Sequence, residues 1–242
     1  MLKSQVSQIP TKWKEVIEDY IENNENHWNI LEKMYKQFSE NNNVFPYLSN
    51  IFKCFHYFNP EDTKVVIIGQ DPYHGTCGTC GTSDLTCQAT GLSFAVNENC
   101  KKPPSLKNIE KELIKDYQQT LEDSTLEKWA KQKILMLNIS LTVLESKPGS
   151  HIKFWTPFTY YILSYISKNV NKIVFVAWGG FAYNVLADIQ PDTQGEEHEH
   201  KCIIRSHPSP LGYSKTMRGH RSFKDSNVFK TINDCLTEKI NW

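Results

Sequence analysis

The stretch KVVIIGQDPYH at residues 64–74 decides the fold. Its first half is a short apolar run rich in β-branched side chains, which is typical of a strand buried on both faces. The run stops at Gly69, and the polar turn QDPYH follows, which Pro72 stiffens. The stretch therefore predicts a central strand that delivers polar groups to one edge of a sheet.

Three further apolar runs have the same character, at residues 133–138, 172–179 and 202–207. Segments with helical spacing separate or flank the four runs, at residues 13–22, 27–39, 105–118, 156–169, 181–189 and 223–240. Strands that alternate with helices predict an α/β fold with a central four-stranded, mostly parallel sheet flanked by helices. Because the sequence shows no linker or repeat, we expect residues 1–242 to form a single domain.

Charge is balanced overall but unevenly distributed. The chain has 27 basic and 27 acidic residues, so its net charge indicates no particular partner. Its three arginines, Arg205, Arg218 and Arg221, all lie in one segment, and residues 205–224 contain no acid. Arginine binds phosphate through a planar fork of donors, so this segment is the best candidate for a nucleic-acid contact, and a solvated basic loop is the alternative. No apolar run reaches the ~18 residues of a membrane span, and we expect no membrane partner.

Each predicted strand ends in a polar or backbone-exposing group. Asp71 follows the first strand, Asn138 ends the second, Gly179 and Gly180 end the third, and His207 ends the fourth. Parallel strands present their carboxyl ends at one edge of the sheet, where ligands of such folds bind. Four such endings indicate a site at that edge.

The residue types at this edge suit an active site, although each also has a simpler interpretation. Asp71 could orient a water molecule or stabilise a cation, or it could only cap a turn. Asn138 offers the donor and acceptor needed to read the edge of a base, or it could only tie down a loop. His207 begins the stiff segment HPSPL, or it could be a core histidine in a proline-rich turn. Leu211, exposed between basic positions, could fill the gap that an extruded base leaves in a stack.

Several enzyme signatures are missing from the sequence. It contains no P-loop motif, HExxH, GxSxG or GxGxxG, which argues against phosphoryl transfer, zinc proteolysis and α/β-hydrolase chemistry. The seven cysteines come with no secretory signal at the start of the chain. We therefore expect reduced thiols in an intracellular compartment.

Taken together, these residues resemble the family-one uracil-DNA glycosylases. GQDPYH at residues 69–74 is similar to that family's water-activating motif, and HPSPL at residues 207–211 is similar to its DNA-intercalation loop. Four shorter motifs match in order, namely GLSFAV at 91–96, PPSLKNI at 103–109, LNISLTV at 137–143 and WGG at 178–180. The resemblance implies the uracil-DNA glycosylase fold and an enzyme that flips uracil out of DNA. Hydrolysis of the N-glycosidic bond would release free uracil and leave an abasic site, with no lyase step.

The resemblance implies four residues that recognise the base. Phe94 would stack on the flipped uracil, and Asn138 would hydrogen-bond its polar edge in a pattern that cytosine cannot satisfy. Gln70 would contact the uracil carbonyls. Tyr73 would stand against the C5 position and exclude thymine, whose methyl group needs the same space.

Two further residues would carry the chemistry. Asp71 would stabilise the cationic sugar and position the attacking water. His207, as a neutral donor, would hydrogen-bond the anionic uracil oxygen. No metal or other cofactor is implied.

The resemblance also implies how the chain would hold DNA. Leu211 would be the wedge, and the backbone contacts would come from His74, Pro104, Ser105, Gly179, Gly180 and Ser209. Two departures from the family pattern fall here. Gly180 stands where the family usually has serine, and Ser214 and Lys215 stand where it commonly has tyrosine and arginine. We expect these departures to change DNA affinity rather than the chemistry.

The largest departure is an insertion at about residues 75–90 that carries Cys77, Cys80 and Cys87. These thiols could bind zinc with His74 or Cys100 as the fourth ligand, but we favour a polar surface loop with free thiols. A second group, formed by His198, His200 and Cys202, is a weaker metal candidate of the same kind.

We expect a monomer that acts on uracil in single- and double-stranded DNA, in the nucleus or cytoplasm wherever the DNA lies. Two other hypotheses remain at this point. The chain could be a replication subunit that keeps the fold and has lost catalysis, which its intact Asp71, Asn138 and His207 argue against. It could also be a different α/β hydrolase or nucleotide enzyme, which would make the two long motifs coincidental.

Overall fold

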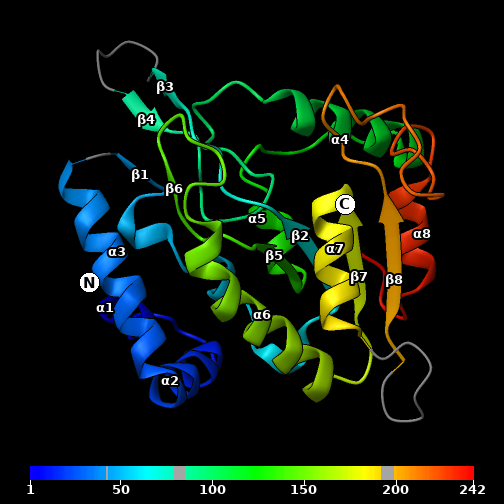
Figure 1. Cartoon of the computed structure of the whole chain (residues 1–242). Helices are drawn as coiled ribbons and strands as arrows, with labels where there is room; N and C mark the ends of the chain where they lie inside the picture. Colours follow the sequence, from blue (N-terminus) through cyan, green and yellow to red (C-terminus); the bar gives the residue numbers. More distant parts are fainter. Residues whose placement is uncertain (42, 79–84, 192–198) are drawn as a thin grey trace.

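The computed structural model describes residues 1–41, 43–78, 85–191 and 199–242. At its centre lies a four-stranded sheet in the order β5-β2-β7-β8, and every neighbouring pair is parallel (Figure 1). The strands are β2 (Val65–Gly69), β5 (Ile134–Asn138), β7 (Val174–Trp178) and β8 (Lys201–Arg205). The predicted α/β fold is therefore confirmed, with strand bounds within two residues of those expected.

Burial explains why the strands were visible in the sequence. Every residue of β2, β5 and β7 is buried, because these three strands carry helices on the sheet faces and include the two central positions. β8 lies at the edge of the sheet and keeps only Ile203 buried. In the pairing of β2 with β5, Gly69 lies beside Asn138. This register brings the ends of two predicted site segments together.

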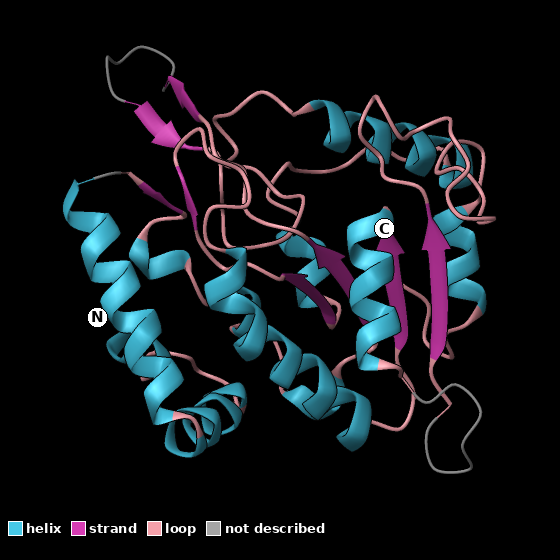
Figure 2. Cartoon of the chain, in the orientation of Figure 1, coloured by secondary structure: helices cyan, strands magenta, loops and turns pink. Residues whose placement is uncertain are grey.

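Helices cover both faces of the sheet, as Figure 2 shows. α6 and α7 lie on the near face, while α5 and α8 lie behind the sheet in Figure 1. α2 and α3 pack against the outer side of α6, and α4 packs against α8. A continuous cluster of buried apolar side chains extends from Leu2 to Trp242. The helices are α1 (Leu2–Val6), α2 (Trp13–Asn23), α3 (Glu25–Asn41), α4 (Pro104–Tyr117), α5 (Glu127–Lys131), α6 (Ile152–Asn169), α7 (Gly180–Ile189) and α8 (Val228–Asp234), with 3-10 turns at Leu48–Asn50, Lys53–Phe55 and Pro60–Asp62.

Two of the predicted helices differ from their expected bounds by more than two residues. α6 begins four residues before the predicted position 156, although Pro157 then lies inside it. The early start buries Trp155 completely, and its indole N–H donates to the hydroxyl of Thr142 at 2.7 Å. α8 is much shorter than the predicted 223–240, because the Asn233 side chain bonds both backbone groups of Ile240 and ends the helix.

Two small sheets were not predicted. β1 (Val44–Phe45) pairs with β6 (Val143–Leu144), and β3 (Thr76–Gly78) pairs with β4 (Leu85–Cys87), both antiparallel. The second pair lies within the insertion, which is therefore not simply a loop. Each strand is only two or three residues long, which is too short for a detectable alternation of side chains.

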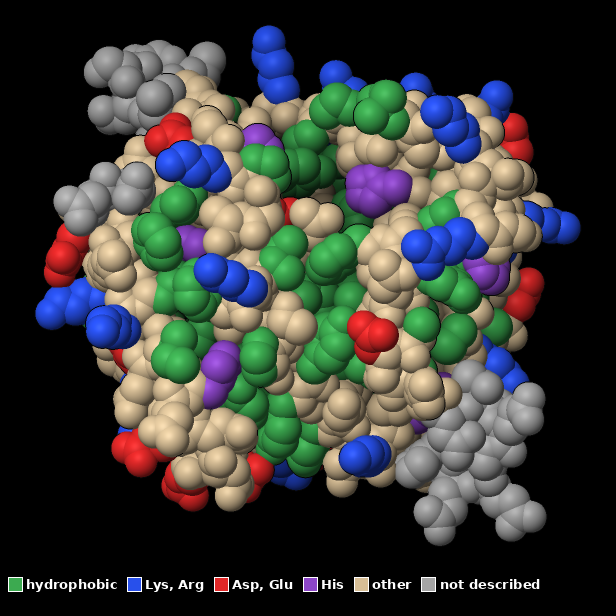
Figure 3. Space-filling view, in the orientation of Figure 1, with side chains coloured by type: hydrophobic (Ala, Val, Ile, Leu, Met, Phe, Trp, Pro, Cys, Tyr) green, Lys and Arg blue, Asp and Glu red, His purple; other side chains and the backbone are tan. Residues whose placement is uncertain are grey.

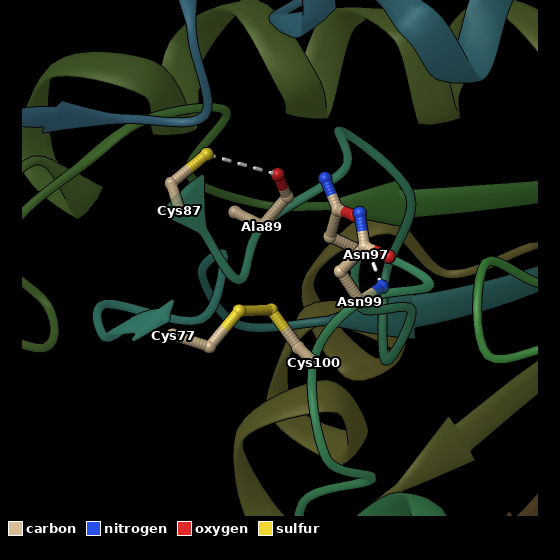
Figure 4. The surroundings of a disulfide bond; sticks show 6 residues. All are labelled: Cys77, Cys87, Ala89, Asn97, Asn99 and Cys100. Atoms are coloured by element: carbon tan, nitrogen blue, oxygen red, sulfur yellow. Dashed lines mark hydrogen bonds between the residues drawn. A yellow bond between two sulfur atoms is a disulfide. The ribbon is translucent and has the colours of Figure 1, made fainter. Parts of the chain in front are cut away.

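The cysteines correct a second expectation about the insertion. Cys77 and Cys100 form a disulfide, with their α-carbons 5.6 Å apart (Figure 4). Cys87 is free, but it is buried and donates to the carbonyl of Ala89. The prediction of free thiols throughout is thus wrong for Cys77 and Cys100, because folding brings residues 23 positions apart into contact. Cys80 lies outside the described residues.

The structure also contradicts the second predicted metal site, the group of His198, His200 and Cys202, at its middle residue. His200 is fully buried, and its Nδ1 accepts the N–H of Ile173 while its Nε2 donates to the carbonyl of Ser167 at 2.8 Å. Both ring nitrogens are engaged by the backbone, so this histidine joins α6 to the sheet. His198 lies outside the described residues, and in the described part of the chain no cluster of His, Cys, Asp or Glu suits a metal ion. None of the described helices is both long and apolar enough to span a bilayer.

Candidate active site

A pocket of about 280 Å³ opens at the carboxyl edge of the sheet. Figure 3 shows a hollow in the upper half of the same face, with histidine side chains on either side of it. The ends of β2, β5 and β7 and the start of α7 contribute to the lining, together with loops from three other parts of the chain. Its lining includes Gln70, Asp71, Tyr73, His74, Phe94, Ser105, Asn138, Pro148, Trp178, Phe181 and His207. Every residue that we predicted to bind the base or carry the chemistry is among them.

Asp71 lies two residues after the end of β2 and lines the pocket. One carboxylate oxygen accepts a hydrogen bond from the backbone N–H of Gly149, and the other lies 3.4 Å from the side-chain nitrogen of Gln70. Burial raises the pKa of the Asp71 carboxyl above its ordinary value, while the Gly149 N–H and His74 oppose the rise. The site thus holds a carboxylate that is partly desolvated and has a fixed orientation.

Asn138 ends β5, and its side chain points across the sheet toward Gly69. A β-carbon on Gly69 would lie only 2.1 Å from the Asn138 Oδ1 atom, so glycine is required there for the amide to occupy its place. Asn138 is only 3% exposed, and it belongs to the lining of the pocket. The amide offers a donor and an acceptor to a ligand in the pocket.

Phe94 forms one wall of the pocket. Its backbone has a φ of 62°, which is uncommon for an aromatic residue and is retained where the surroundings enforce it. The ring centre lies 5.2 Å from that of Trp178 and 6.0 Å from that of His207. The exposed part of this ring faces the cavity and offers a flat surface on which a planar ligand could stack.

His207 follows β8 and is held as a neutral donor. Its Nδ1 accepts the backbone N–H of Ser209 at 3.0 Å, so the ring proton of the neutral form must lie on Nε2. Burial lowers the pKa of this imidazole, which favours the neutral form further. Gly179 allows the ring to lie close, because a β-carbon there would be 2.9 Å from that of His207.

Tyr73 lies on the turn after Asp71 and closes another side of the pocket. Its hydroxyl is buried and has no hydrogen-bond partner among the described residues, and burial raises its pKa. Pro72 precedes it and restricts the turn. The ring is therefore a rigid wall rather than a mobile side chain.

The HPSPL segment leads from the pocket to the surface, where Leu211 has 82% of its area exposed. The segment is braced rather than loose. The side chain of Asn108 on α4 donates to the carbonyl of Pro208 at 2.7 Å, and the backbone N–H of Tyr213 donates to the carbonyl of Ser209 at 2.8 Å. Tyr213 also donates its hydroxyl to the buried Glu112 of α4. The bracing therefore holds the exposed Leu211 in a fixed position beside the pocket.

The other predicted DNA-contact residues surround the mouth but differ in their distance from the cavity. Ser105 and His74 line it, whereas Gly179, Gly180, Ser209 and Leu211 lie beyond its lining on the neighbouring segments. Pro104 is the first residue of α4, directly before Ser105. We call these residues the rim of the pocket.

The basic segment needs one correction. Arg205 is half-buried in β8, and its guanidinium donates to the carbonyl of Ile204 at 2.9 Å. Burial also lowers its pKa. Arg205 is therefore a structural residue. Of the three arginines, only Arg218 and Arg221 are exposed.

Several residues of the site were not predicted, and two of them come from one loop. Pro148 lines the pocket, and the N–H of Gly149 orients Asp71. The adjacent Pro-Gly pair is a turn signal that predicts a loop. Its approach to Asp71, 78 positions away in the chain, has no signal in a single sequence.

The family model described as the uracil DNA glycosylase superfamily matches residues 55–236, which is most of the chain. The chain belongs to this superfamily. It is 37% identical to a uracil-DNA glycosylase of Aliarcobacter butzleri over 95% of this chain and 99% of the relative. It is 40% identical to the uracil-DNA glycosylase of Dictyostelium discoideum over 82% of this chain, and there it spans only about half of the relative, 53%. Among solved structures, mimivirus uracil-DNA glycosylase superposes with a TM-score of 0.83 at 30% identity, covering 93% of this chain and 84% of the viral one.

Proposed function

We propose that the pocket takes uracil extruded from DNA and hydrolyses the bond between uracil and deoxyribose, with Asp71 and His207 as its catalytic residues. Membership of the uracil-DNA glycosylase superfamily makes the chain a hydrolase of N-glycosyl bonds that removes uracil from DNA. The roles of individual residues are inferred from the geometry of the pocket. The observation that carries them is the convergence of Asp71, Phe94, Asn138 and His207 on one cavity of about 280 Å³.

Recognition of the base follows from three surfaces of the pocket. The ring of Phe94 stacks on the flat face of uracil. The amide of Asn138 donates to a uracil carbonyl and accepts a hydrogen bond from the N3–H group, and Gln70 adds a contact from the pocket lining. Cytosine carries an amino group and no N3 proton, so it leaves the Asn138 amide incompletely bonded, which is costly in a buried site. Tyr73 occupies the space that the methyl group of thymine needs.

The chemistry follows from the different charges of Asp71, a carboxylate, and His207, a neutral imidazole. The C1′–N1 bond breaks, and its electron pair leaves with uracil while positive charge develops on the sugar. The Asp71 carboxylate stabilises this charge and orients a water molecule that adds to C1′ and transfers one proton to the carboxylate. The Nε2–H of neutral His207 donates to the uracil oxygen on which negative charge develops. General-base assistance contributes roughly 10²–10⁴ in rate and an oxyanion donor roughly 10²–10³.

The rim holds the DNA while the base is extruded. Leu211 enters the stack where uracil leaves it, because an apolar side chain fills that gap without needing a hydrogen-bond partner. Ser105, Ser209, His74 and the glycine pair contact the flanking backbone. We infer that one copy of the chain acts on uracil in either single- or double-stranded DNA.

The test is a single-turnover release assay with an oligonucleotide that carries one deoxyuridine. Wild-type protein should release uracil, and matched oligonucleotides with cytosine or thymine at the same position should stay intact. The Asp71→Asn variant should release uracil at least about 10²-fold more slowly while its binding to the oligonucleotide stays measurable. Near-normal release by this variant would remove Asp71 from the mechanism.

A further inference from the structure

Arg218 lies at the tip of a tight turn beside the pocket. Met217 and His220 exchange backbone hydrogen bonds of 3.1 and 2.8 Å, and the two residues between them, Arg218 and Gly219, have φ values of 49° and 82°. This is the geometry of a two-residue hairpin turn with positive φ at both central positions. Glycine adopts it freely, whereas a long side chain at the first position is uncommon and has to be held by its surroundings.

The guanidinium of Arg218 is held by two residues of α7. It lies over the ring of Tyr183, with 5.1 Å between the guanidinium carbon and the ring centre. One nitrogen donates to the Asn184 Oδ1 atom at 2.6 Å. His220 packs on the same ring from the other end of the turn, with the ring centres 5.4 Å apart. None of these partners is an anion, so the positive charge is oriented without being neutralised.

The turn lies next to the mouth of the pocket. Phe181 and Ala182 line the cavity, and Tyr183 and Asn184 follow them directly on α7. A β-carbon on Gly180 would lie 3.7 Å from the sulfur of Met217, so the turn packs against the start of the same helix. Arg218 is therefore held within about one helical turn of the residues that line the site.

We propose that Arg218 is a preset phosphate clamp, in which the guanidinium held by Tyr183 and Asn184 binds a backbone phosphate of the DNA beside the extruded nucleotide. The inference rests on the proposed function in taking DNA as the ligand. Arg205 cannot serve, because it is half-buried and bonded to the backbone. The guanidinium of Arg218 keeps its other N–H donors for a phosphate, and a fixed guanidinium loses little conformational freedom when it binds one.

The experiment measures the affinity for a duplex that carries one 2′-fluoro-deoxyuridine, which resists hydrolysis, at a series of salt concentrations. The Arg218→Gln variant removes the charge and keeps an amide that can still bond Asn184. It should bind about fivefold more weakly at low salt. The slope of log affinity against log salt should also fall in magnitude by about 0.9, as expected for one lost phosphate contact on duplex DNA.

Lys168→Gln is the matched control for loss of one exposed cation. Lys168 lies in the last turn of α6, whose first turn is near Gly149 and Asp71, so the helix places it about 25 Å from the site. Its slope should equal that of the wild type. The Tyr183→Leu variant leaves the charge in place but removes its platform, and it should weaken duplex binding in the same direction as Arg218→Gln.

If the salt dependence of duplex binding by Arg218→Gln has the same slope as that of the wild type, the clamp is overturned. The clamp is also overturned if Lys168→Gln loses as much affinity for the duplex as Arg218→Gln does, because the effect would then be one of net charge. Inhibition of the enzyme by free uracil should be the same in all variants, since the pocket is untouched. Failure of the proposed function is distinguishable, because the wild type itself would then fail to release uracil.

Discussion

At the scale of single residues, Asp71 and His207 are shifted in opposite directions by the same cause. Burial disfavours the charged form of each, so the pKa of the carboxyl rises and the pKa of the imidazole falls. The mechanism needs a charged carboxylate and a neutral imidazole. Burial therefore assists His207 and opposes Asp71, and the Gly149 N–H offsets part of the cost for Asp71.

This cost should be visible as a gain in stability when the charge is removed. Unfolded Asp71 titrates near its ordinary value of 3.8, and folded Asp71 titrates higher. Ionisation therefore destabilises the fold as pH rises through the window between the two pKa values, and the cost is fully present at neutral pH. Asp71→Asn should raise the melting temperature at pH 7 by on the order of 2 °C. The gain should shrink toward pH 4, and a gain that is absent at pH 7 or grows in acid would contradict the raised pKa.

Tyr73 is predicted to set specificity at the same scale. In the Tyr73→Ala variant the space beside Pro72 opens, and a thymine methyl group can enter. We expect measurable release of thymine from a duplex oligonucleotide in which one thymine is part of a mismatched base pair. Release of uracil should be retained. Because truncation of a buried aromatic ring can cost about 3 kcal/mol or more, the melting temperature should be measured alongside. A folded variant that releases uracil and still rejects thymine would refute the steric role of the ring.

At the scale of elements, the braced loop at residues 207–213 carries the wedge. Leu211 makes few contacts with the protein, so Leu211→Ala should leave the melting temperature within about 1 °C of the wild type. Extrusion from a duplex requires unstacking and unpairing, which a single strand largely avoids. The variant should therefore lose more activity on duplex than on single-stranded substrate, by about tenfold in the ratio of kcat/KM values. Equal losses on both substrates would show that Leu211 does not act as a wedge.

The elements also show what a sequence pattern can and cannot predict. The runs that became β2, β5 and β7 were predicted to within two residues, because strands buried on both faces are apolar throughout. α8 was predicted too long, since its ends are decided by tertiary bonds such as those of Asn233 with Ile240. The short α5 and the two-residue strands β1 and β6 carry no periodic signal at all.

At the scale of the whole molecule, the disulfide between Cys77 and Cys100 ties the insertion to the segment that leads into α4. It closes a loop between residues 23 positions apart, and a cross-link of that length stabilises a fold by roughly 3 kcal/mol in the chain-entropy account. Reduction, or the Cys100→Ser variant, should therefore lower the melting temperature by several degrees. The free thiols should be counted by mass after alkylation under non-reducing conditions. Equal melting curves with and without reductant would show that the bond does not stabilise the fold.

The pocket itself is a property of the whole chain. The residues at strand ends, Asp71, Asn138 and His207, could be placed together from the rule for parallel sheets. Phe94 was assigned by resemblance to a family, because it lies on a loop with no strand to position it. Gly149 could not be found at all, and Arg218 was predicted only as part of a basic segment, without its turn or its contacts with α7. Their positions depend on contacts between distant segments that no local pattern records.

The most direct measurement is a crystal structure of the Asp71→Asn variant with a duplex that carries one deoxyuridine. We expect the uracil ring to lie against Phe94 with its polar edge on Asn138 and one carbonyl near the Nε2 atom of His207. Leu211 should fill the position in the stack that uracil has left. A uracil that remains stacked in the duplex, or that lies in a cavity away from these side chains, would contradict this expectation.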